Sequence, residues 1–426
     1  MNYMNKDKPQ CDIAIIGGGP AGMLAAIAAR MNTKANVILV EKNPTVGVKL
    51  LLTGKGRCNI TNTRPIKETV QVFGKQGSFF YGPLARFSNQ DLINFLESLN
   101  VPTKIEGGGR VFPLDNKATS VVEALRKKVR GVGAKILMNK QVLKIKGGQD
   151  GFNILMPKKV SIKCQKVIIA TGGKSYSATG SSGDGYRFAE ELGHTIVEPS
   201  PALAPLLVKD KTIRSLAGLD LDNVKLTVTV GGQERLNRFG DMIFTHQGIS
   251  GPIILDISRH IHQLTKIGLP IIAHINLKPS LDDSALKKRI YRDIHQNSQK
   301  EYQTLLAGLL PKSLITTAIR KTNIDEHAKN GQLTPEQISR LINFLRDFNF
   351  IIDGVAPIEA GIITAGGVEL DEIDSTNMES KLVSGLYFAG EVINLHGPTG
   401  GFNLQQAFST GWLAGYSAGQ SLLSDQ

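Results

Sequence analysis

Short apolar runs alternate with glycine-rich turns and amphipathic stretches along most of the chain. Near the beginning, the apolar run 13–16 leads directly into glycines and an alanine-rich stretch of helical character, and a second apolar run, 36–40, ends at Glu41. Apolar runs of four to eight residues that are bounded by turn residues are typical of buried strands. The pattern therefore predicts a β-strand, a helix and a second, parallel strand within the first fifty residues.

Two later runs have the same character. Residues 167–173 (VIIATGG) and 385–392 (GLYFAGEV) each read as a buried strand that ends in a turn. The second is followed by Gly400, Gly401 and an apolar helix from about Asn403. We assign both runs to the same α/β domain as the N-terminal unit.

Between these two runs the pattern changes. After Pro199 it turns to short strands such as 223–232 and 269–277, and from Ser280 it becomes helical. The strand-like segment 358–368 then returns toward the first domain. The middle of the chain is therefore expected to be an insertion that interrupts the α/β domain.

One helix of the insertion has a clear start. In TPEQISRLINFL, Thr334 stands at the N-cap, Pro335 at the first helical position and Gln337 at the third. This is the capping-box arrangement, in which the cap and third residues satisfy each other's backbone N–H groups.

The first turn of the chain carries a nucleotide-binding pattern. Gly17, Gly19 and Gly22 fit G-x-G-x-x-G, and Glu41 follows the second strand about twenty residues later. Such glycines allow a tight turn, a close approach of backbone to a pyrophosphate, and close helix–strand packing, while the acid accepts hydrogen bonds from the adenosine ribose. The free N–H groups of the helix then face the phosphates. A bound dinucleotide is predicted.

The two later turns favour FAD over NAD. Ala170, Thr171 and Gly172 form a turn that brings the chain back to the cofactor, and Gly390 with Glu391 ends the other strand. In FAD enzymes of the glutathione-reductase type, an acid at that place binds the ribityl chain. The next helix points its N-terminus at the flavin pyrimidine edge, where it stabilises negative charge.

Composition adds a charge asymmetry to this picture. The 426 residues carry a net charge of +13 and 45 glycines, which exceeds the usual glycine share of about 7%. Residues 101–170 contain fifteen Lys or Arg and four Asp or Glu, or +11. The densest part, RKKVR at 126–130, is expected on a helix. Either it is a solvated helix face, or the segment binds an anionic partner, RNA first of all.

The cysteines limit the chemistry. Cys11, Cys58 and Cys164 are odd in number, far apart and without CxxC spacing. Neither a disulfide framework nor a zinc site follows from them, so a reducing cytoplasm and no metal are expected. No run offers the ~20 uninterrupted apolar residues of a membrane helix.

The segment LLTGKGRCNITN, residues 51–62, has several possible meanings. Its spacing excludes a Walker A loop, and a sequon in a cytoplasmic protein meets no glycosylation machinery. Its place after Glu41 indicates a loop that crosses the pyrophosphate and reaches the flavin. There Arg57 could neutralise a phosphate or the reduced ring, while Asn59 and Thr61 donate hydrogen bonds. For Cys58 we favour contact with the flavin over redox catalysis, because no resolving cysteine is present.

The chain resembles the BaiN-like (YhiN-type) flavoproteins over nearly its whole length. The marks are TGKGRCNITN, GRVFPLDNKATSVVEAL, ATGGKSYSATGSSGDGYRFAEELGHTI, GDMIFTHQGISGP, ITAGGV and GLYFAGEVINLHGPTGGFNLQQAFSTG. This sequence departs from the family pattern at three positions. Ser177 stands where the family usually has proline, and Asn394 and His396 stand where it often has Asp.

The resemblance implies an α/β fold with an α+β insertion. A Rossmann-like FAD domain (1–198 and 369–426) is interrupted by a β-barrel-like substrate domain (199–279 and 349–368), which carries a helical domain (280–348). The residues expected to contact FAD are Gly17, Gly19, Pro20, Ala21, Gly22, Glu41, Lys42, Lys49, Gly56, Arg57, Cys58, Asn59, Thr61, Val142, Ala170, Thr171, Gly172, Gly390, Glu391, Gly401, Asn403 and Leu404.

The catalytic residues are less well defined. Cys58, His246 and His396 are the candidates, although for His246 a packed, hydrogen-bonded structural role is the favoured interpretation. The segment G-I-S-G-P at 248–252 does not match the G-x-S-x-G nucleophile elbow of hydrolases. Because no second βαβ fingerprint is present, NAD(P)H would dock only transiently as reductant, or the substrate itself would reduce the enzyme.

The family resemblance leaves three functions open. The first is hydride transfer through FAD to uridine in ribosomal RNA, which the basic segment 101–170 favours. The second is small-molecule chemistry, as an amine oxidase or an enoyl/steroid-type reductase. The third is RNA binding by a flavoprotein whose FAD is not catalytic. Neither DNA nor a membrane is an expected partner.

Overall fold

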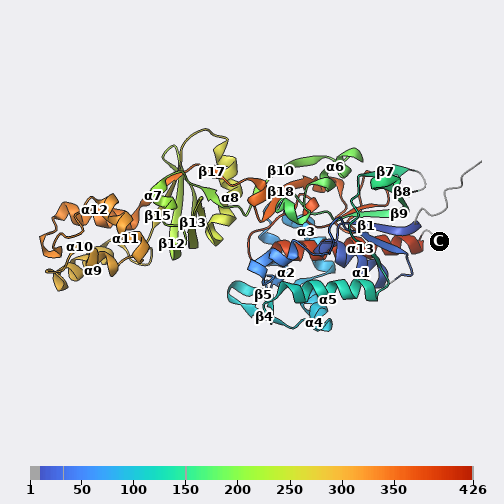
Figure 1. Cartoon of the computed structure of the whole chain (residues 1–426), viewed down its shortest axis with the longest axis horizontal. Helices are drawn as coiled ribbons and strands as arrows, with labels where there is room; N and C mark the ends of the chain where they lie inside the picture. Colours follow the sequence, from blue (N-terminus) through green and yellow to red (C-terminus); the bar gives the residue numbers. More distant parts are fainter. Residues whose placement is uncertain (1–9, 32, 149–150, 425–426) are drawn as a thin grey trace, which may run out of the picture. The chain divides into compact units, whose positions relative to one another are not determined.

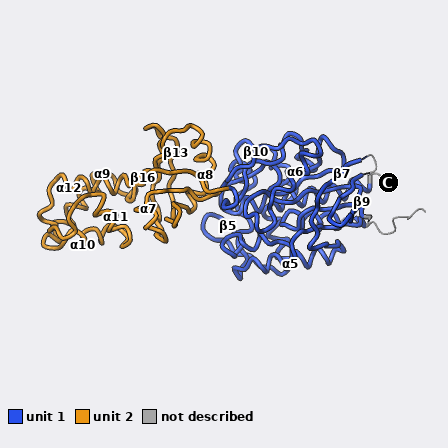
Figure 2. Tube along the Cα trace, turned by 45° about the horizontal axis from the view of Figure 1, so that its top comes forward, with its two compact units in different colours: residues 1–202, 358–426 blue, residues 203–357 orange. Residues whose placement is uncertain are grey.

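The computed structural model describes residues 10–31, 33–148 and 151–424. Figure 2 shows two compact units: unit 1 comprises residues 1–202 and 358–426, and unit 2 residues 203–357. The described residues of each unit form a hydrophobic core of their own. Unit 2 is thus an insertion in the chain of unit 1. Within the described residues, no helix is both long and apolar enough to cross a membrane.

Unit 1 is built on a seven-stranded sheet. Its strands follow the order β6 (Lys135–Leu137), β2 (Val37–Val40), β1 (Gln10–Ile16), β9 (Ser161–Ile169), β8 (Gly151–Leu155) and β7 (Lys144–Gly148), with β19 (Leu386–Phe388) also beside β9. The strands β6, β2, β1, β9 and β19 run parallel, whereas β8 and β7 are antiparallel to their neighbours. The first half of β9 pairs with β8 and its last three residues pair with β19.

The register brings the carboxyl ends of the parallel strands into one row. Ile16 pairs with both Val40 and Ile169, and Ile169 pairs with Phe388. The residues that follow these four strand ends therefore lie together at the carboxyl end of the sheet. In open α/β sheets, ligands bind at this end.

In unit 1, helix α1 (Pro20–Met31) packs against both α13 (Phe402–Ser424) and α5 (Ala118–Gly131) (Figure 1). Glycines on α13 allow its backbone to touch that of α1. The facing pairs are Gly411 with Ala21, Gly415 with Ala25, and Gly419 with Ala29. At Gly415, a Cβ would lie 2.1 Å from the carbonyl oxygen of Ala25, so a larger residue cannot fit without separating the helices.

Smaller elements complete unit 1. Its other helices are α2 (Ile66–Gln71), α3 (Gly77–Arg86), α4 (Asn89–Ser98) and α6 (Asp184–Glu191). A three-stranded sheet has the order β3 (Thr61–Asn62), β5 (Arg110–Pro113) and β4 (Thr103–Glu106), and β10 (Ile196–Ala202) pairs with β18 (Ile363–Val368). Short 3-10 turns include η1 (Leu50–Gly56), which opens the predicted cofactor loop.

Unit 2 combines a sheet with a helical segment. The strand order is β16 (Phe348–Ile352), β15 (Ile271–Asn276), β12 (Asp220–Val230), β13 (Gln233–Thr245), β14 (Gly248–Ser250), β11 (Leu206–Leu207) and β17 (Gly354–Val355). The helices are α7 (Lys211–Arg214), α8 (Pro252–Thr265), α9 (Asp283–Gln296), α10 (Tyr302–Ala307), α11 (Lys312–Thr322) and α12 (Pro335–Arg346). Because α9 to α12 lie in sequence between the paired strands β15 and β16, they form an excursion from the sheet.

The helical excursion shares one core with its sheet. Leu286 of α9 and Leu341 of α12 belong to the same buried cluster as Ile275 of β15 and Phe348 of β16. Thr334 caps α12 as expected, with its side chain accepting from the N–H of Gln337 and the reciprocal bond present. The finer division of this region into a barrel-like and a helical domain stays a prediction.

Candidate functional site

The glycine turn after β1 has the shape that a dinucleotide requires. Gly17 adopts φ +108°, and a Cβ there would lie 2.4 Å from the carbonyl oxygen of Ala170. At Gly22, a Cβ would overlap the carbonyl oxygen of Gly17 at 1.9 Å. Gly19 is different, because a Cβ would meet nothing within 4 Å. The turn is therefore closed toward the sheet and open at Gly19, where α1 begins and its first N–H groups lack intrahelical acceptors.

Glu41 lies directly beside this turn and is buried. Its Oε2 accepts a hydrogen bond from Gly18 N–H at 2.7 Å, and its Oε1 accepts from Asn43 N–H at 2.8 Å. Its backbone carbonyl accepts from Lys140 N–H at 2.9 Å, which brings the loop of Val142 to the same place. The expected acid is thus in position and oriented, and it retains lone pairs for ribose hydroxyls.

Lys42, the next residue, points to a different partner. Its Nζ donates to Asp184 Oδ2 at 2.8 Å, at the start of α6, and it also donates to Ser182. Lys42 therefore joins the end of β2 to the loop that follows the Thr171–Gly172 turn. In this arrangement it supports the rim of the site through an ion pair.

Glu391 is the centre of a polar cluster. Its Oε2 accepts from Lys49 Nζ at 2.5 Å, and its Oε1 accepts from Ser175 Oγ at 2.9 Å and from Thr364 N–H at 2.8 Å. Lys49 also donates to Ser175 Oγ at 2.7 Å. The side chains of Lys49 and Glu391 are only 20% and 19% exposed. The acid that was expected at the ribityl chain is therefore held by three chain segments.

The sequence did not reveal three groups of this cluster, Ser175, Thr364 and Tyr186. Tyr186 of α6 is buried, and burial together with the negative charge of Glu391 raises the pKa of its hydroxyl far above the ordinary value. The hydroxyl stays protonated and makes no hydrogen bond of good geometry to the described residues. A buried, protonated donor beside the carboxylate is thus available to a ligand.

Side chains of α13 fix the two turns that precede it. The N–H of Gly390 donates to Thr410 Oγ1 at 2.9 Å, and Gln406 Nε2 donates to the carbonyl of Gly390 at 3.0 Å. Asn403 accepts from Gly397 N–H at 2.8 Å and returns a bond to the Gly397 carbonyl at 2.9 Å. The half-buried Leu404 follows on the same helical turn. The N-terminus of α13 is thereby positioned by its own first turns.

The loop 59–62 lies against the start of α13. Thr61 Oγ1 donates to Gln405 Oε1 at 2.5 Å, and Asn62 Nδ2 donates to the carbonyl of Gly400 at 3.1 Å. A Cβ on Gly401 would lie 2.4 Å from the Thr61 carbonyl. In the orientation that satisfies its amide, Asn59 accepts from Gly401 N–H at 3.1 Å. The structure thus brings together two segments that are 340 residues apart in the sequence.

Arg57 contacts other protein groups. Its guanidinium lies 4.2 Å over the Phe112 ring, donates to Asn116 Oδ1 at 2.7 Å and pairs with Glu106. The preceding Gly56 takes φ +84°, which turns the chain toward this sheet. The arginine is therefore oriented by β4, β5 and the turn after β5.

Cys58 is a buried thiol. It is 0% exposed, adopts φ +62°, and its N–H donates to the carbonyl of Thr53 at 2.9 Å. Burial raises the pKa of Cys58 to about 12, although a hydrogen bond with Thr53 acts in the opposite direction. Because only the thiolate is a nucleophile, this group is inert at neutral pH. The geometry agrees with a packing or cofactor-contact role.

The two candidate histidines lie in different units. His396 is half-buried in unit 1, where its backbone N–H donates to Gln76 Oε1 at 3.4 Å. Gln76 Nε2 in turn donates to the carbonyl of Asn394 at 2.6 Å. His246 lies in unit 2, and its carbonyl accepts from Arg214 Nε at 2.7 Å. Ser177 begins a short 3-10 turn after the Thr171 loop.

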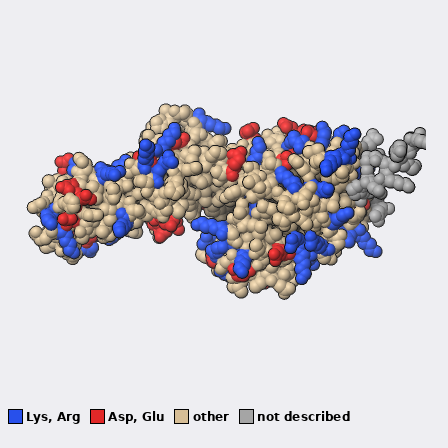
Figure 3. Space-filling view, in the orientation of Figure 1, with Lys and Arg blue, Asp and Glu red and all other residues tan. Residues whose placement is uncertain are grey.

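Twelve of the fifteen basic residues of segment 101–170 fall into three groups on unit 1. The groups are Lys104 and Arg110 on β4 and β5; Arg126, Lys127, Lys128, Arg130 and Lys135 on α5 and β6; and Lys144, Lys146, Lys158, Lys159 and Lys163 on β7 to β9 and their turns. Since β6 and β7 are the two edge strands of this order, Lys135 lies at one edge of the sheet and Lys144 and Lys146 lie at the other, whereas Lys163 on β9 lies between them. Figure 3 shows Lys and Arg gathered over β7 and the end of α5.

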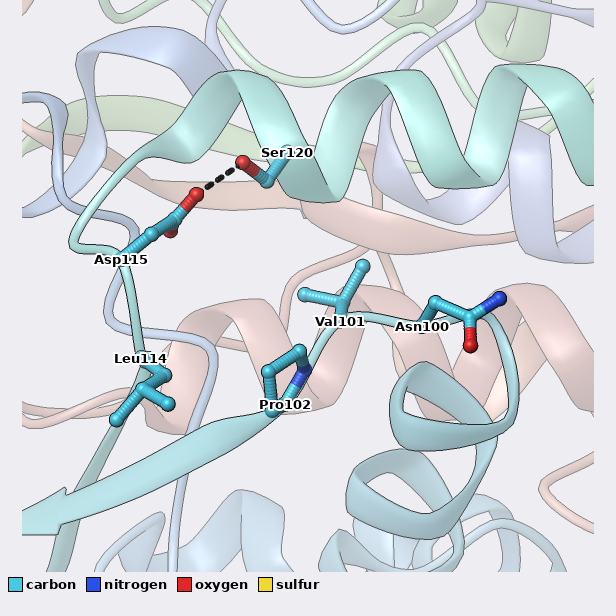
Figure 4. A pocket seen from close by; sticks show the side chains of 6 residues that line it. All are labelled: Asn100, Val101, Pro102, Leu114, Asp115 and Ser120. Atoms are coloured by element: carbon cyan, nitrogen blue, oxygen red, sulfur yellow. Dashed lines mark hydrogen bonds between the residues drawn. The ribbon is translucent and has the colours of Figure 1, made fainter.

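A pocket of about 320 Å³ lies on unit 1. It is lined by Asn100, Val101, Pro102, Leu114, Asp115 and Ser120, at the base of the β4–β5 hairpin (Figure 4). Asp115 accepts from Ser120 Oγ and Lys117 N–H, so its carboxylate is occupied by the start of α5. The pocket therefore contains none of the residues expected to hold a cofactor. Among the described residues, no three His, Cys, Asp or Glu side chains gather as metal ligands.

The residues at the carboxyl end of the parallel strands fit FAD. The open Gly19 and the α1 N-terminus suit a pyrophosphate, Glu41 a ribose, and Glu391 with Lys49 and Tyr186 a polyhydroxyl chain. When bound, FAD supplies hydride transfer, and the chain supplies position and electrostatics.

Comparisons with known proteins agree with this geometry. Over 409 residues the chain is 32% identical to the 3-dehydro-bile acid delta(4,6)-reductase of Clostridium scindens, covering 96% of this chain and 99% of that protein. It is 29% identical to the ribosomal RNA dihydrouridine synthase of Haemophilus influenzae, covering 95% and 97%.

The fold also matches solved structures. A flavocytochrome c3 fumarate reductase gives a TM-score of 0.54 at 19% identity, covering 98% of this chain and 79% of that one. The 3-ketosteroid-delta4-(5alpha)-dehydrogenase of Rhodococcus jostii RHA1 gives 0.54 at 16% identity, covering 98% of both chains. The family described as "HI0933-like protein Rossmann domain" matches residues 11–417. The chain belongs to this HI0933-like family, which includes the BaiN-like proteins it resembles, and is an FAD-dependent oxidoreductase.

Proposed function

We propose that this oxidoreductase reduces uridine to dihydrouridine in ribosomal RNA, with NAD(P)H as a transiently bound reductant. The observation that carries the proposal is the positive charge of unit 1, where segment 101–170 places exposed lysines and arginines on several elements. Cations that contact phosphates supply much of the affinity of proteins for nucleic acids. A small uncharged substrate gives no reason for this surface.

The reaction is one that a flavoenzyme can perform. The C5=C6 double bond of uridine is conjugated to the C4 carbonyl, so a hydride adds at C6 and a proton at C5 while NAD(P)H becomes NAD(P)⁺. The base must leave its stack to be reached. On this proposal, residues 59–62 and the turn before α13 form the place where the base is presented, since Thr61 and Asn62 fix that turn.

Names of relatives support the same reading. Two proteins that are 29% identical to this chain, from Haemophilus influenzae and Escherichia coli, are ribosomal RNA dihydrouridine synthases. Both are covered almost entirely by the match, at 97% and 96% of their length.

A second candidate is reduction of a conjugated ketone such as a 3-oxo steroid. The observation that favours it is the 32% identity to a bile-acid reductase over 99% of that protein. The chemistry is closely related, because a carbon–carbon double bond conjugated to a carbonyl again receives a hydride and a proton. The two candidates therefore differ in substrate recognition, and an assay of substrates separates them.

The test is anaerobic reoxidation of the enzyme. The purified FAD protein is reduced with NADH or NADPH and then mixed with ribosomal RNA that lacks dihydrouridine, or with a 3-oxo-Δ4 steroid. Flavin absorbance should return with the RNA, and mass spectrometry should find dihydrouridine in it. Reoxidation by the steroid alone would replace the proposal by the second candidate.

A further inference from the structure

One face of the small sheet β3–β5–β4 gathers cations beside the cofactor loop. In its register, Asn62 pairs with Arg110, Arg110 with Glu106, and Lys104 with Phe112. Cross-strand partners project to the same side of a sheet, and so do residues two apart on one strand. These five side chains therefore share one face, which Arg57 joins by lying over Phe112. We call the set Arg57, Lys104 and Arg110 the hairpin cations.

Two of the hairpin cations contact a single carboxylate, and the third, Arg110, donates from Nε to the carbonyl of Gly107 at 2.9 Å. Glu106 pairs with Arg57 and lies 3.4 Å from Lys104 Nζ, and the guanidinium of Arg110 lies 5.9 Å from the centre of the Phe112 ring. The hydrogen bond from Arg57 lowers the pKa of Glu106, so this carboxylate stays ionised. The face nevertheless keeps a net charge of +2, from three cations and one anion, which favours a second anion from outside.

Arg57 is prepared to bind that anion. The Phe112 ring, Asn116 and Glu106 fix its guanidinium through Nε and one terminal nitrogen. The other terminal nitrogen makes no hydrogen bond to the described residues, and the side chain is 37% exposed. A planar guanidinium that is already oriented loses little conformational entropy when it binds a phosphate.

The position of this face matters more than its charge. Strand β3 is one edge of the sheet, and its two residues contact Gln405 at the start of α13 and Gly400 in the turn before it. A phosphate on the hairpin cations would therefore be close to the place where the substrate meets the flavin site. The lysines of β7 to β9 lie farther from the flavin site. Lys163 precedes Ile169 by six residues, or roughly 20 Å along the strand at 3.3 Å per residue.

We propose that the hairpin cations bind the phosphates that flank the uridine being reduced, and that the lysines of β7 to β9 do not take part in this positioning. The inference rests on the proposed function and goes further, because it names the surface that reads the RNA strand next to the reacting base. Single-stranded RNA is the partner, since only a splayed strand presents both a base and its neighbouring phosphates.

The test compares two double variants that each remove two positive charges. They are Lys104→Ala/Arg110→Ala on the face with the hairpin cations, and Lys146→Ala/Lys163→Ala on strands β7 and β9. The probe is an oligouridylate of about ten nucleotides, within the range that one binding groove covers. Binding is measured over a series of salt concentrations, with FAD content and thermal unfolding as controls for folding.

For the hairpin variant, the slope of log K against log salt should fall by roughly 1.4 in magnitude, because each single-strand phosphate contact contributes about 0.7. The β7–β9 variant should keep the wild-type slope. An equal loss in both variants, or a loss in the β7–β9 variant alone, would overturn the inference, as would a wild type that binds ribosomal RNA and ignores the oligouridylate.

The proposed function can fail separately. If the wild type forms dihydrouridine and the hairpin variant binds and reduces RNA as well as the wild type, only the inference is lost. If the wild type forms no dihydrouridine and binds no RNA, the proposed function is lost and the inference with it.

Discussion

The close contact of α1 with α13 can be tested by adding one methyl group to α13. In Gly415→Ala, the new Cβ would lie 2.1 Å from the carbonyl oxygen and 2.6 Å from the Cα of Ala25, both of them backbone atoms. Contacts below 3.0 Å do not occur for real Cβ atoms, so the helices must separate by about 1 Å. Overpacking of this kind costs about 1–3 kcal/mol. Since Ala is favoured over Gly in a helix by about 1 kcal/mol, we expect a net loss of about 2 kcal/mol at the severe end of that range.

The assay is urea unfolding followed by the fluorescence of Trp412. This is the only tryptophan of the sequence, and it lies on α13 with its ring stacked on Phe87 at 4.5 Å. Its signal therefore reports on unit 1. We also expect Gly415→Ala to retain less FAD, because both helices begin at turns assigned to the cofactor.

The matched control is Gly131→Ala at the end of α5. A Cβ there would meet nothing within 4 Å, so the same substitution should be neutral or stabilising by up to about 1 kcal/mol. A Gly415→Ala protein as stable as Gly131→Ala, with full FAD content, would refute the close packing of the two helices.

The remaining predictions concern single side chains. Cys58→Ser should keep FAD and turnover, because burial raises the thiol's pKa to about 12; lost turnover with bound FAD would show a catalytic thiol. Lys49→Met should destabilise unit 1 by about 2–3 kcal/mol, less than the loss from a fully buried pair, and should weaken FAD retention, since Glu391 loses its cation; unchanged urea midpoint and FAD content would contradict this. Thr334→Ala should cost about 1 kcal/mol through loss of the α12 cap, read by circular dichroism, whereas an unchanged midpoint would show the cap to be unimportant. Burial lowers the pKa of His194 below its ordinary 6.5 despite Glu372, so the unfolded chain takes up a proton first and the free energy of unfolding should fall as pH drops below about 6.5; the fall should shrink in His194→Gln, and an equal fall in both would exclude this histidine.

Much of unit 1 could be predicted from the sequence because its signals are local. Strand β1, the glycine turn and Glu41 lie within about thirty residues, and each has a conformational requirement that glycine or an acid meets. The same holds for the α12 cap, where Thr334 and Gln337 are three residues apart. The family resemblance is confirmed by the match over residues 11–417.

The rest depends on contacts that sequence spacing does not show. Thr364 and Ser175 meet Glu391 only because β18 and the loop after β9 lie together at the sheet edge, and these segments are 189 residues apart in the chain. The sequence predicts Arg57 at the cofactor, but its partners Glu106 and Asn116 come from β4 and from the turn after β5, which no local pattern placed beside it. The basic segment is continuous in the sequence, but the strand order separates Lys135 on β6 from Lys144 and Lys146 on β7, and it places Lys104 and Arg110 on another sheet.

The central claim is that this FAD enzyme reduces uridine in ribosomal RNA. Its most direct test is mass-spectrometric mapping of dihydrouridine in ribosomal RNA after incubation with the purified enzyme and NAD(P)H, the RNA having been taken from a strain in which the gene is deleted. We predict that dihydrouridine appears at a defined position and depends on both the enzyme and the reductant. Ribosomal RNA that stays free of new dihydrouridine, while the same enzyme preparation oxidises NAD(P)H with a conjugated ketone, would contradict the account.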